Sequence, residues 1–245
     1  MPGTTQFLSD LHLSAERPLA TQAFERFLDG PAAQADAVYV LGDLFEYWAG
    51  DDDLDDAFNA QVVQRLARVA RKVPVHVMHG NRDFLLAQRF AASAGVLPLH
   101  DPTVVDLYGM RTLLTHGDLL CTQDRRYQAF RRVVRNRLAQ GVFMRLPLQR
   151  RKRIIGGARR MSEGEKTVKR MEIMDVMPAA VEEAFRRYDC SRMIHGHTHR
   201  AARHELEVDG RRRERWVLSD WYRTGQYLRV SADNWESVPM PFAIA

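Results

Sequence analysis

The sequence predicts an α/β fold: a two-sheet α/β sandwich flanked by helices, with a helical cap inserted between its halves. Before residue 120, short β-rich runs alternate with helical patterns, as in folds that cover a sheet with helices. After residue 190 the sequence pattern becomes that of strands joined by turns. A basic, helical segment at about 124–175 separates these parts. A length of 245 residues suits one domain, 1–245, that carries this insertion.

Local periodicity supports each expected element. Short apolar runs rich in β-formers, each followed by a polar loop, are expected to be buried strands of a largely parallel sheet. Apolar residues three or four positions apart predict the helices between them. Asp209-Gly210 is a predicted hairpin turn. The expected strands are 5–8, 37–41, 73–78 and 111–115, and the expected helices include 19–27 and 58–69.

Composition excludes several classes of protein. A hydrophobic share of 45% and a charged share of 27% are ordinary for a globular protein, so long disorder is not expected. No apolar run reaches the roughly 18 residues of a bilayer-spanning helix, and the N-terminus lacks the features of an export signal. The two cysteines, Cys121 and Cys190, are too few for a disulfide framework and favour a reducing cytoplasm.

The net charge of +5 conceals a strong local asymmetry. Residues 125–170 hold sixteen Lys or Arg and two acids, which leaves 20 basic and 29 acidic residues elsewhere. This segment is therefore +14 and the rest of the chain is −9. Such a region is typical of a site for a phosphate-bearing ligand, a nucleic acid or an anionic membrane.

Apolar residues within the basic segment recur at helical spacing. Tyr127, Phe130, Val134 and Leu138 lie on one such pattern, and arginines occupy the other positions. One interpretation is a charged helix packed on the core. The other is a cap that holds an amphiphile, with apolar side chains for its tails and arginines for its phosphates. Aromatic residues do not alternate with the arginines as stacking platforms, so no nucleic-acid partner is expected.

Polar clusters follow the expected strands, and they carry the chemistry. Ligands bind just outside the carboxyl ends of strands in α/β sheets, so these clusters should converge. Each cluster alone is weak evidence for a functional site, but five such clusters in this order are rarely explained by packing alone. Their carboxylates, imidazoles and amide suit Mn²⁺, Fe²⁺ or Zn²⁺, and they are numerous enough for two ions that share a carboxylate. The clusters are Asp10-Leu11-His12, Gly42-Asp43, Gly80-Asn81-Arg82-Asp83, His116-Gly117-Asp118 and His195-Gly196-His197-Thr198-His199.

This order of motifs resembles the calcineurin-like metallophosphoesterases, which are two-sheet sandwiches with a dinuclear metal centre. Within that superfamily the chain is most similar to the UDP-2,3-diacylglucosamine pyrophosphohydrolase family of lipid A biosynthesis, over nearly its whole length. It departs from the family pattern at Lys166, Ala201 and Ser219-Asp220. The motifs that carry the resemblance include 41–46, 50–53, 79–85, 116–118, 121–122, 127–131, 173–176 and 194–200.

The resemblance implies roles for individual residues and two Mn²⁺ ions per chain. One ion would be held by Asp10, His12, Asp43 and His199, and the other by Asp43, Asn81, His116 and His197, with Asp43 bridging. Asp43, Asn81, Arg82 and His116 would form the catalytic set. The substrate-binding residues would be Asn81, Arg82, Asp124, Ser162, Lys166, Lys169 and His197.

Arg82 indicates which bond is cleaved. Phosphoesterases of this superfamily usually carry His at this position, where an imidazole can protonate a departing alkoxide. Arginine does not give up a proton at neutral pH, but it stabilises phosphoryl oxygens through paired hydrogen bonds. The site therefore favours a leaving group that is stable as an anion, as in a pyrophosphate.

The expected activity is hydrolysis of the pyrophosphate bond of UDP-2,3-diacylglucosamine to UMP and 2,3-diacylglucosamine 1-phosphate, by attack of metal-bound hydroxide on the α-phosphorus. The expected partners are this lipid-linked nucleotide and the anionic inner-membrane surface, which places the protein in the cytoplasm at the inner face of the membrane. The alternative is another dinuclear metallophosphoesterase that acts on nucleotides or phosphodiesters. The sequence leaves acyl-chain length and oligomeric state open.

Overall fold

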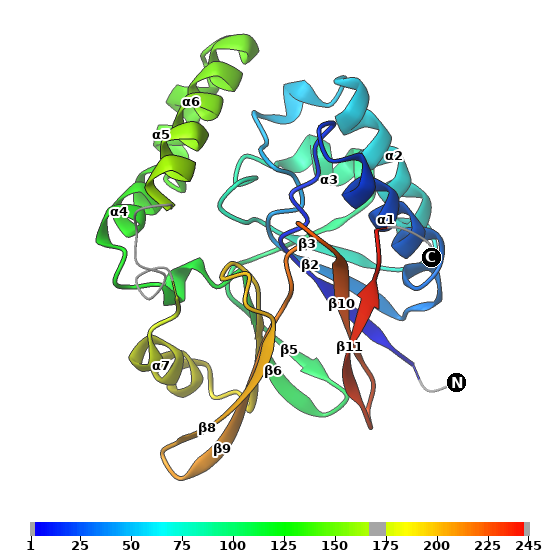
Figure 1. Ribbon diagram of the computed structural model, residues 1–245, viewed down its shortest axis with the longest axis vertical. Coiled ribbons are helices and arrows are strands. Elements are labelled where there is room, and N and C mark those ends of the chain that lie inside the picture. The colour runs from blue at the N-terminus through cyan, green and yellow to red at the C-terminus, as the bar shows by residue number, and fades with distance from the viewer. Residues whose placement is uncertain (1–2, 167–174, 243–245) are drawn as a thin grey trace.

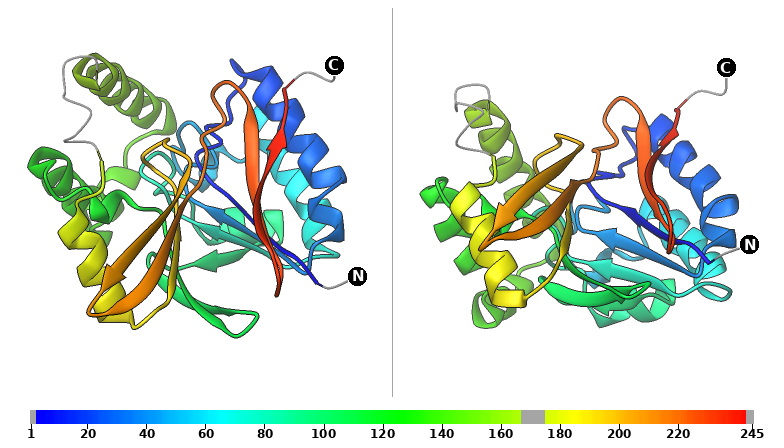
Figure 2. Two further views of the ribbon diagram at one scale, coloured as in Figure 1. Left: turned by 60° about the horizontal axis from the view of Figure 1, so that its bottom comes forward. Right: turned by 90° about the horizontal axis from the view of Figure 1, so that it is seen from below.

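Two mixed β-sheets face each other in the computed structural model, with helices on their outer faces (Figures 1 and 2). The structure describes residues 3–166 and 175–242, and within helix α6 (Leu148–Lys166) it describes side chains as far as residue 158. The expected two-sheet sandwich is therefore observed. The sheets are mixed rather than largely parallel, because the hairpin strands from the end of the chain join both of them.

The six-stranded sheet has the order β11-β10-β1-β2-β3-β4. Its first four strands in the chain run parallel, and β10 pairs antiparallel with β1, so that Phe7 lies between Tyr39 and Leu228. Its strands are β1 (Thr5–Leu8), β2 (Ala37–Leu41), β3 (Val75–Met78), β4 (Leu97–Leu99), β10 (Gly225–Val230) and β11 (Trp235–Met240).

The five-stranded sheet has the order β5-β6-β7-β9-β8, in which β6, β7 and β9 are parallel. The predicted turn at Asp209-Gly210 joins β8 to β9, and both residues have positive φ, as a tight hairpin requires. Its strands are β5 (Thr103–Leu107), β6 (Met110–Thr115), β7 (Arg192–His195), β8 (Ala202–Val208) and β9 (Arg211–Val217).

The helices complete a layered core. Helices α1 (Pro18–Asp29), α2 (Ala57–Ala70) and α3 (Gln88–Ala94) pack on the six-stranded sheet through buried residues such as Phe24 and Leu66. Helix α7 (Pro178–Tyr188) packs on the other sheet through Val181 and Phe185. A third apolar cluster, which includes Phe7 and Ile194, lies between the sheets. None of the helices in the described part of the chain combines the length and the apolarity needed to cross a membrane.

The basic segment forms helices α4 (Arg125–Val134), α5 (Arg137–Met144) and α6, which stand beside the sandwich (Figure 1). We call these three helices the cap. The prediction that one helical pattern runs from Tyr127 to Leu138 is wrong, because the helix breaks at Arg135. There the side chain of Asn136 accepts hydrogen bonds from the backbone N–H groups of Leu138 and Ala139 and so starts a new helix.

Ion pairs with acids of the sandwich attach α4. The buried carboxylate of Asp118 accepts hydrogen bonds from Tyr127 Oη and Arg131 Nε, each at 2.7 Å. Arg131 and Arg135 also approach Asp101 Oδ2, at 3.4 and 3.7 Å. The carboxylates of the sandwich therefore offset the charge of both arginines.

A second set of contacts attaches α6. Arg151 is 1% exposed and donates hydrogen bonds to the carbonyl oxygen of Ala49 and to a carboxylate oxygen of Asp52. Lys152 Nζ lies 2.6 Å from Asp53 Oδ1. The acidic residues at 51–53 thus bind the first turn of α6 through ion pairs. The cap is therefore attached at α4 and at the first turn of α6 by charges that are far apart in the sequence.

Candidate metal centre and active site

Most of the predicted metal ligands have an unusual backbone conformation. Five of the seven adopt positive φ although none is glycine, and the loops that carry them follow the carboxyl ends of strands. Such residues are uncommon outside functional sites, although Asp and His tolerate this region better than most. The surrounding fold must therefore hold them. They are Asp10 (φ 53°), His12 (φ 50°), Asp43 (φ 53°), His197 (φ 71°) and His199 (φ 56°).

One cluster joins the loop after β1 to the loop after β7. Potential ligand atoms of Asp10, His12 and His199 all lie within 4.8 Å of one another. Asp10 Oδ1 is 4.0 Å from His12 Nε2 and 3.5 Å from His199 Nε2, and His12 Nε2 is 3.7 Å from Asp43 Oδ2. The structure thus brings together the four residues predicted to hold the first ion.

A second cluster lies beside the first. Asp10, Asp43 and His116 again offer ligand atoms within 4.8 Å of one another, with His116 Nε2 3.9 Å from Asp43 Oδ2. Asn81 Oδ1 is 3.0 Å from His116 Nε2 and 2.9 Å from His197 Nδ1. The four residues predicted for the second ion therefore also converge, and both Asp10 and Asp43 stand between the two clusters.

The donor set fits metal ions. Asp10 Oδ1 and both ring nitrogens of His12 are buried and have no hydrogen-bond partner among the described residues. Leaving such groups unsatisfied is costly, and a cation that accepts the lone pairs of Asp10 Oδ1 and of one His12 nitrogen removes much of the cost. Imidazole and carboxylate ligands are typical of first-row divalent ions.

Electrostatics keep several of these side chains in the form that binds metal. Burial lowers the pKa of His12 well below its usual value and that of His197 to about 3, so both imidazoles are neutral. Burial raises the pKa of Asp43 to about 7. Although burial alone would lower the pKa of His116, the Asp43 and Asp10 carboxylates raise it to about 9. In the metal-free protein, the raised pKa values of Asp43 and His116 favour protonation of both side chains, and a bound cation would displace these protons.

Two glycines of the sequence motifs allow the loops to approach each other. A Cβ atom on Gly80 would lie 1.9 Å from Asp43 Oδ1, and one on Gly196 would lie 2.2 Å from Asp10 Oδ2. No side chain fits at these distances. The Gly-Asn and Gly-His motifs therefore combine a ligand with the small residue that lets it reach its partners.

Three residues beside the clusters were missed by reasoning from the sequence. Glu46 Oε2 lies 3.5 Å from His12 Nδ1, and its Oε1 lies 3.7 Å from an Arg82 guanidinium nitrogen. Asp220 Oδ2 is 3.8 Å from His199 Nδ1, and the Tyr222 ring stacks on His12 at 5.1 Å. Carboxylates beside a metal-binding histidine commonly orient it. Glu46 lies within the motif at 41–46, but nothing in the neighbouring sequence indicates that it contacts a metal-binding histidine.

The predicted substrate-binding residues have different positions. The main-chain N–H of Arg82 donates to Asp43 Oδ1 at 2.8 Å, which ties it to the metal cluster. Asp124 caps α4 by accepting a hydrogen bond from the Tyr127 N–H at 3.1 Å. Ser162 and Lys166 lie in α6 beyond the described side chains, and Lys169 lies outside the described residues.

Fold and site together define a metal-dependent phosphoesterase, and comparison with known proteins agrees. The model of the calcineurin-like phosphoesterase family matches residues 5–201, and the chain belongs to this family. It is 50% identical to the UDP-2,3-diacylglucosamine hydrolase of Aeromonas hydrophila over 92% of this chain and 93% of that one. Identity to the protein of the same name from Pseudomonas paraeruginosa is 47%, over 96% and 98% of the two chains. Among solved structures, an archaeal phosphodiesterase has a TM-score of 0.48 at 13% identity, covering 96% of this chain and 99% of that one.

Proposed function

We propose that the protein hydrolyses the pyrophosphate bond of UDP-2,3-diacylglucosamine to UMP and 2,3-diacylglucosamine 1-phosphate. The observation that carries this proposal is the pair of buried ligand clusters in a chain about half identical to hydrolases named for that substrate. The activity would make it an enzyme of lipid A biosynthesis.

Arg82 supports cleavage of a pyrophosphate in particular. Its backbone is fixed to Asp43 and its guanidinium lies beside Glu46, so the side chain is held next to the ligand clusters. A guanidinium stabilises charge on phosphoryl oxygens but does not protonate a leaving group at neutral pH. UMP leaves as a stable anion and needs no such proton. The proposal assigns Asn81 to the same phosphoryl group, since its side chain lies between His116 and His197.

The proposed cofactors are two Mn²⁺ ions. Asp10, His12, Asp43 and His199 would hold one, and Asp43, Asn81, His116 and His197 the other. When bound, such ions lower the pKa of water and offset phosphoryl charge. Imidazole-rich sites favour Mn²⁺ over Mg²⁺. Chelation should abolish turnover and Mn²⁺ should restore it better than Mg²⁺, which an assay after verified metal removal measures; full activity in excess chelator contradicts the assignment.

We further propose that the cap, at about 124–175, covers the acyl chains of the substrate. A cavity of about 870 Å³ separates α5 from the sandwich, within the size range of ligand pockets. Phe84, Leu85 and Met144 supply part of its apolar wall. Phe130 and Leu138, which the sequence offered for this role, are 50% and 82% exposed and are not among the residues that line this cavity.

The exposed part of the cap supports a proposed peripheral association with the cytoplasmic face of the inner membrane. Val133 and Val142 are exposed together with Phe130 and Leu138, although each is a large apolar residue. Apolar side chains beside basic ones are typical of surfaces that contact anionic lipids.

Labelled water tests the proposed activity and the bond that is broken. If water attacks the α-phosphorus, ¹⁸O from the solvent should appear in UMP and be absent from the sugar phosphate. Mass spectrometry of both products measures this. Label found only in the lipid product would mean attack at the other phosphorus, and no release of UMP from the lipid nucleotide would overturn the proposed substrate.

A further inference from the structure

His195, the last residue of β7, is completely buried directly before the loop that carries His197 and His199. Both nitrogens of its ring have partners. Nδ1 is 2.8 Å from the carbonyl oxygen of Gly196, and Nε2 is 3.0 Å from a guanidinium nitrogen of Arg215. His195 is therefore outside the two ligand clusters but in contact with the loop that completes them.

These partners fix the position of the ring proton. A guanidinium has donors only, so Arg215 must donate to Nε2, and Nε2 must accept. In the neutral imidazole the hydrogen then lies on Nδ1, which donates it to the Gly196 carbonyl oxygen. Arg215 thus selects the tautomer that can hold the loop.

The backbone of Gly196 is a sensitive point of the site. Its carbonyl oxygen lies in the peptide that joins it to His197, which we call the Gly196 peptide, and this oxygen also accepts a hydrogen bond from the Thr198 N–H at 2.9 Å. The N–H of Gly196, in the preceding peptide, donates to the carbonyl oxygen of His116 at 3.0 Å. A rotation of the Gly196 peptide would move His197 and His199, whose positive φ values the loop must maintain. This peptide therefore leads directly into the ligands that the loop supplies to both clusters.

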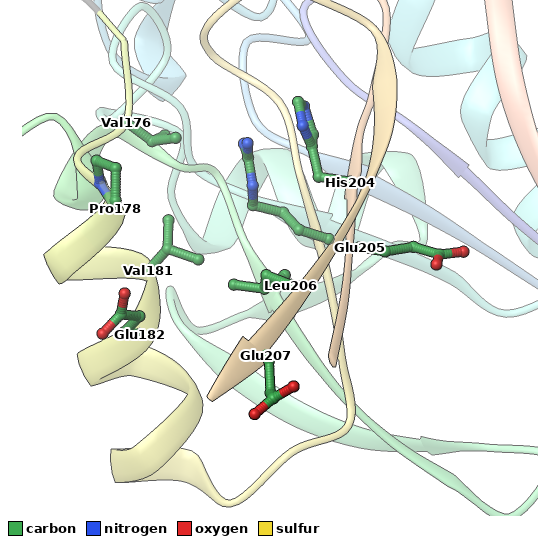
Figure 3. A pocket seen from close by; sticks show the side chains of 9 residues that line it. Val176, Pro178, Val181, Glu182, His204, Glu205, Leu206 and Glu207 are labelled. Carbon is green, nitrogen blue, oxygen red and sulfur yellow. The ribbon is translucent and has the colours of Figure 1, made fainter. Parts of the chain in front are cut away.

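Among the described residues the Arg215 guanidinium hydrogen-bonds only the His195 side chain, and the Asp175 carboxylate attracts it from a greater distance. It reaches His195 from the wall of a cavity of about 260 Å³ between α7 and β8, where Val181 faces Leu206 across the space (Figure 3). No carboxylate in the described part of the chain forms an ion pair with its guanidinium. A partly buried cation without such a pair is costly to keep, and among the described residues its guanidinium hydrogen-bonds the His195 imidazole.

We propose that Arg215 and His195 are positioning residues of the metal centre: a relay from the outer layer of the fold that holds the Gly196 peptide and, through it, His197 and His199. This inference rests on the proposed metal centre and adds two residues that touch neither metal nor substrate. Residues that support metal ligands typically change metal affinity by about 10–100-fold when they are removed.

Calorimetric titration of metal-free protein with Mn²⁺ tests the relay, with the thermal midpoint of each metal-free variant as a measure of folding. Arg215→Met keeps the length of the side chain and removes its donors, whereas Arg215→Lys keeps one donor. His195→Leu removes the bond to Gly196, and His195→Asn offers an amide N–H in place of Nδ1. The matched control is Arg213→Met, which removes another arginine of β9, a buried one that donates to the carbonyl oxygen of Cys190.

We expect Arg215→Met and His195→Leu to weaken Mn²⁺ binding by about 10–100-fold, and Arg215→Lys and His195→Asn to recover most of the loss. Arg213→Met should lower the thermal midpoint and leave Mn²⁺ affinity unchanged. The relay is overturned if Arg215→Met binds Mn²⁺ within about twofold of wild type, or if Arg213→Met weakens binding equally. If Arg215→Met does not fold, the two His195 variants carry the same comparison. Wild-type protein that binds no Mn²⁺ would overturn the metal centre and the relay with it.

Discussion

The loops of the metal site and the cap are held in place by different kinds of bond. Main-chain hydrogen bonds tie the first two loops together: Asp10 N to Gly42 O at 3.1 Å, and His12 N to Asp43 O at 2.9 Å. The cap instead depends on side-chain ion pairs, such as Arg131 with Asp118, and much of its apolar surface is exposed.

The two kinds of attachment predict different responses to substitution. The main-chain bonds between the first two loops do not depend on the side chains that these loops carry, so a substitution of Asp10, His12 or Asp43 should remove a ligand while the loop persists. The cap is attached through a small number of side chains, so one substitution can change its position. If the cap covers the acyl chains as proposed, an attachment through side chains would let its position differ between substrates while the ligand loops stay the same.

Removal of a shared carboxylate from the rigid region should have the largest effect. Asp43→Ala should reduce turnover by roughly a thousandfold or more, because the carboxylate stands between the two clusters and positions both ions. The fold should largely survive, since Asp43 lies at a strand end. Turnover, bound Mn²⁺ and the thermal midpoint check this prediction; a variant that binds both ions and turns over within tenfold of wild type contradicts it.

Loss of the anchor of α4 should be the largest effect in the cap. Asp118→Asn should lower the free energy of unfolding by about 3 kcal/mol, because Arg131 and Arg135 would lose a buried counter-charge. Urea unfolding measures this, with Asn136→Ala, which removes a helix cap worth about 1 kcal/mol, as the control. If both variants lower the free energy of unfolding by the same amount, the ion pairs do not anchor the cap.

The cavity beneath the cap can be compared with the surface of the cap by two matched truncations. Phe84→Ala should weaken binding of the diacylated substrate by about tenfold or more, since its ring lines the cavity. Phe130→Ala should have a smaller effect because its ring is half exposed. The Michaelis constants for long-chain and deacylated substrates measure both effects. A larger effect of Phe130→Ala would place the acyl chains on the outer surface of α4.

Charge reversal on the surface of the cap should have the smallest effect. Arg150→Glu and Arg153→Glu should each weaken adsorption to anionic vesicles by about 1 kcal/mol, and less as salt rises, because both residues are exposed. Vesicle sedimentation measures this. Arg151 and Lys152 must stay unchanged, because their pairs with Asp52 and Asp53 attach α6. Adsorption that does not respond to either reversal would remove the proposed membrane contact.

Local patterns in the sequence were enough for strands β1, β2, β3 and β6, the hairpin turn at 209–210 and the expectation that the ligand clusters converge. Alternating apolar runs and helical spacing are local properties, and parallel strands necessarily deliver their carboxyl ends to one edge. The short strands β4 and β5 gave no such signal. The joining of β10 to β1 depends on pairing between residues more than 200 positions apart, which no local window contains.

Only the tertiary structure shows which charged side chains lie near the metal site and which form buried contacts that hold the fold together. In the sequence, Arg151 is one of four consecutive basic residues; in the fold it is buried against Asp52, 99 positions away. Arg215 lies among the charges of an exposed hairpin, yet it reaches a buried histidine. Burial and pairing set the energy of a charge, and both depend on partners that only the folded chain brings together.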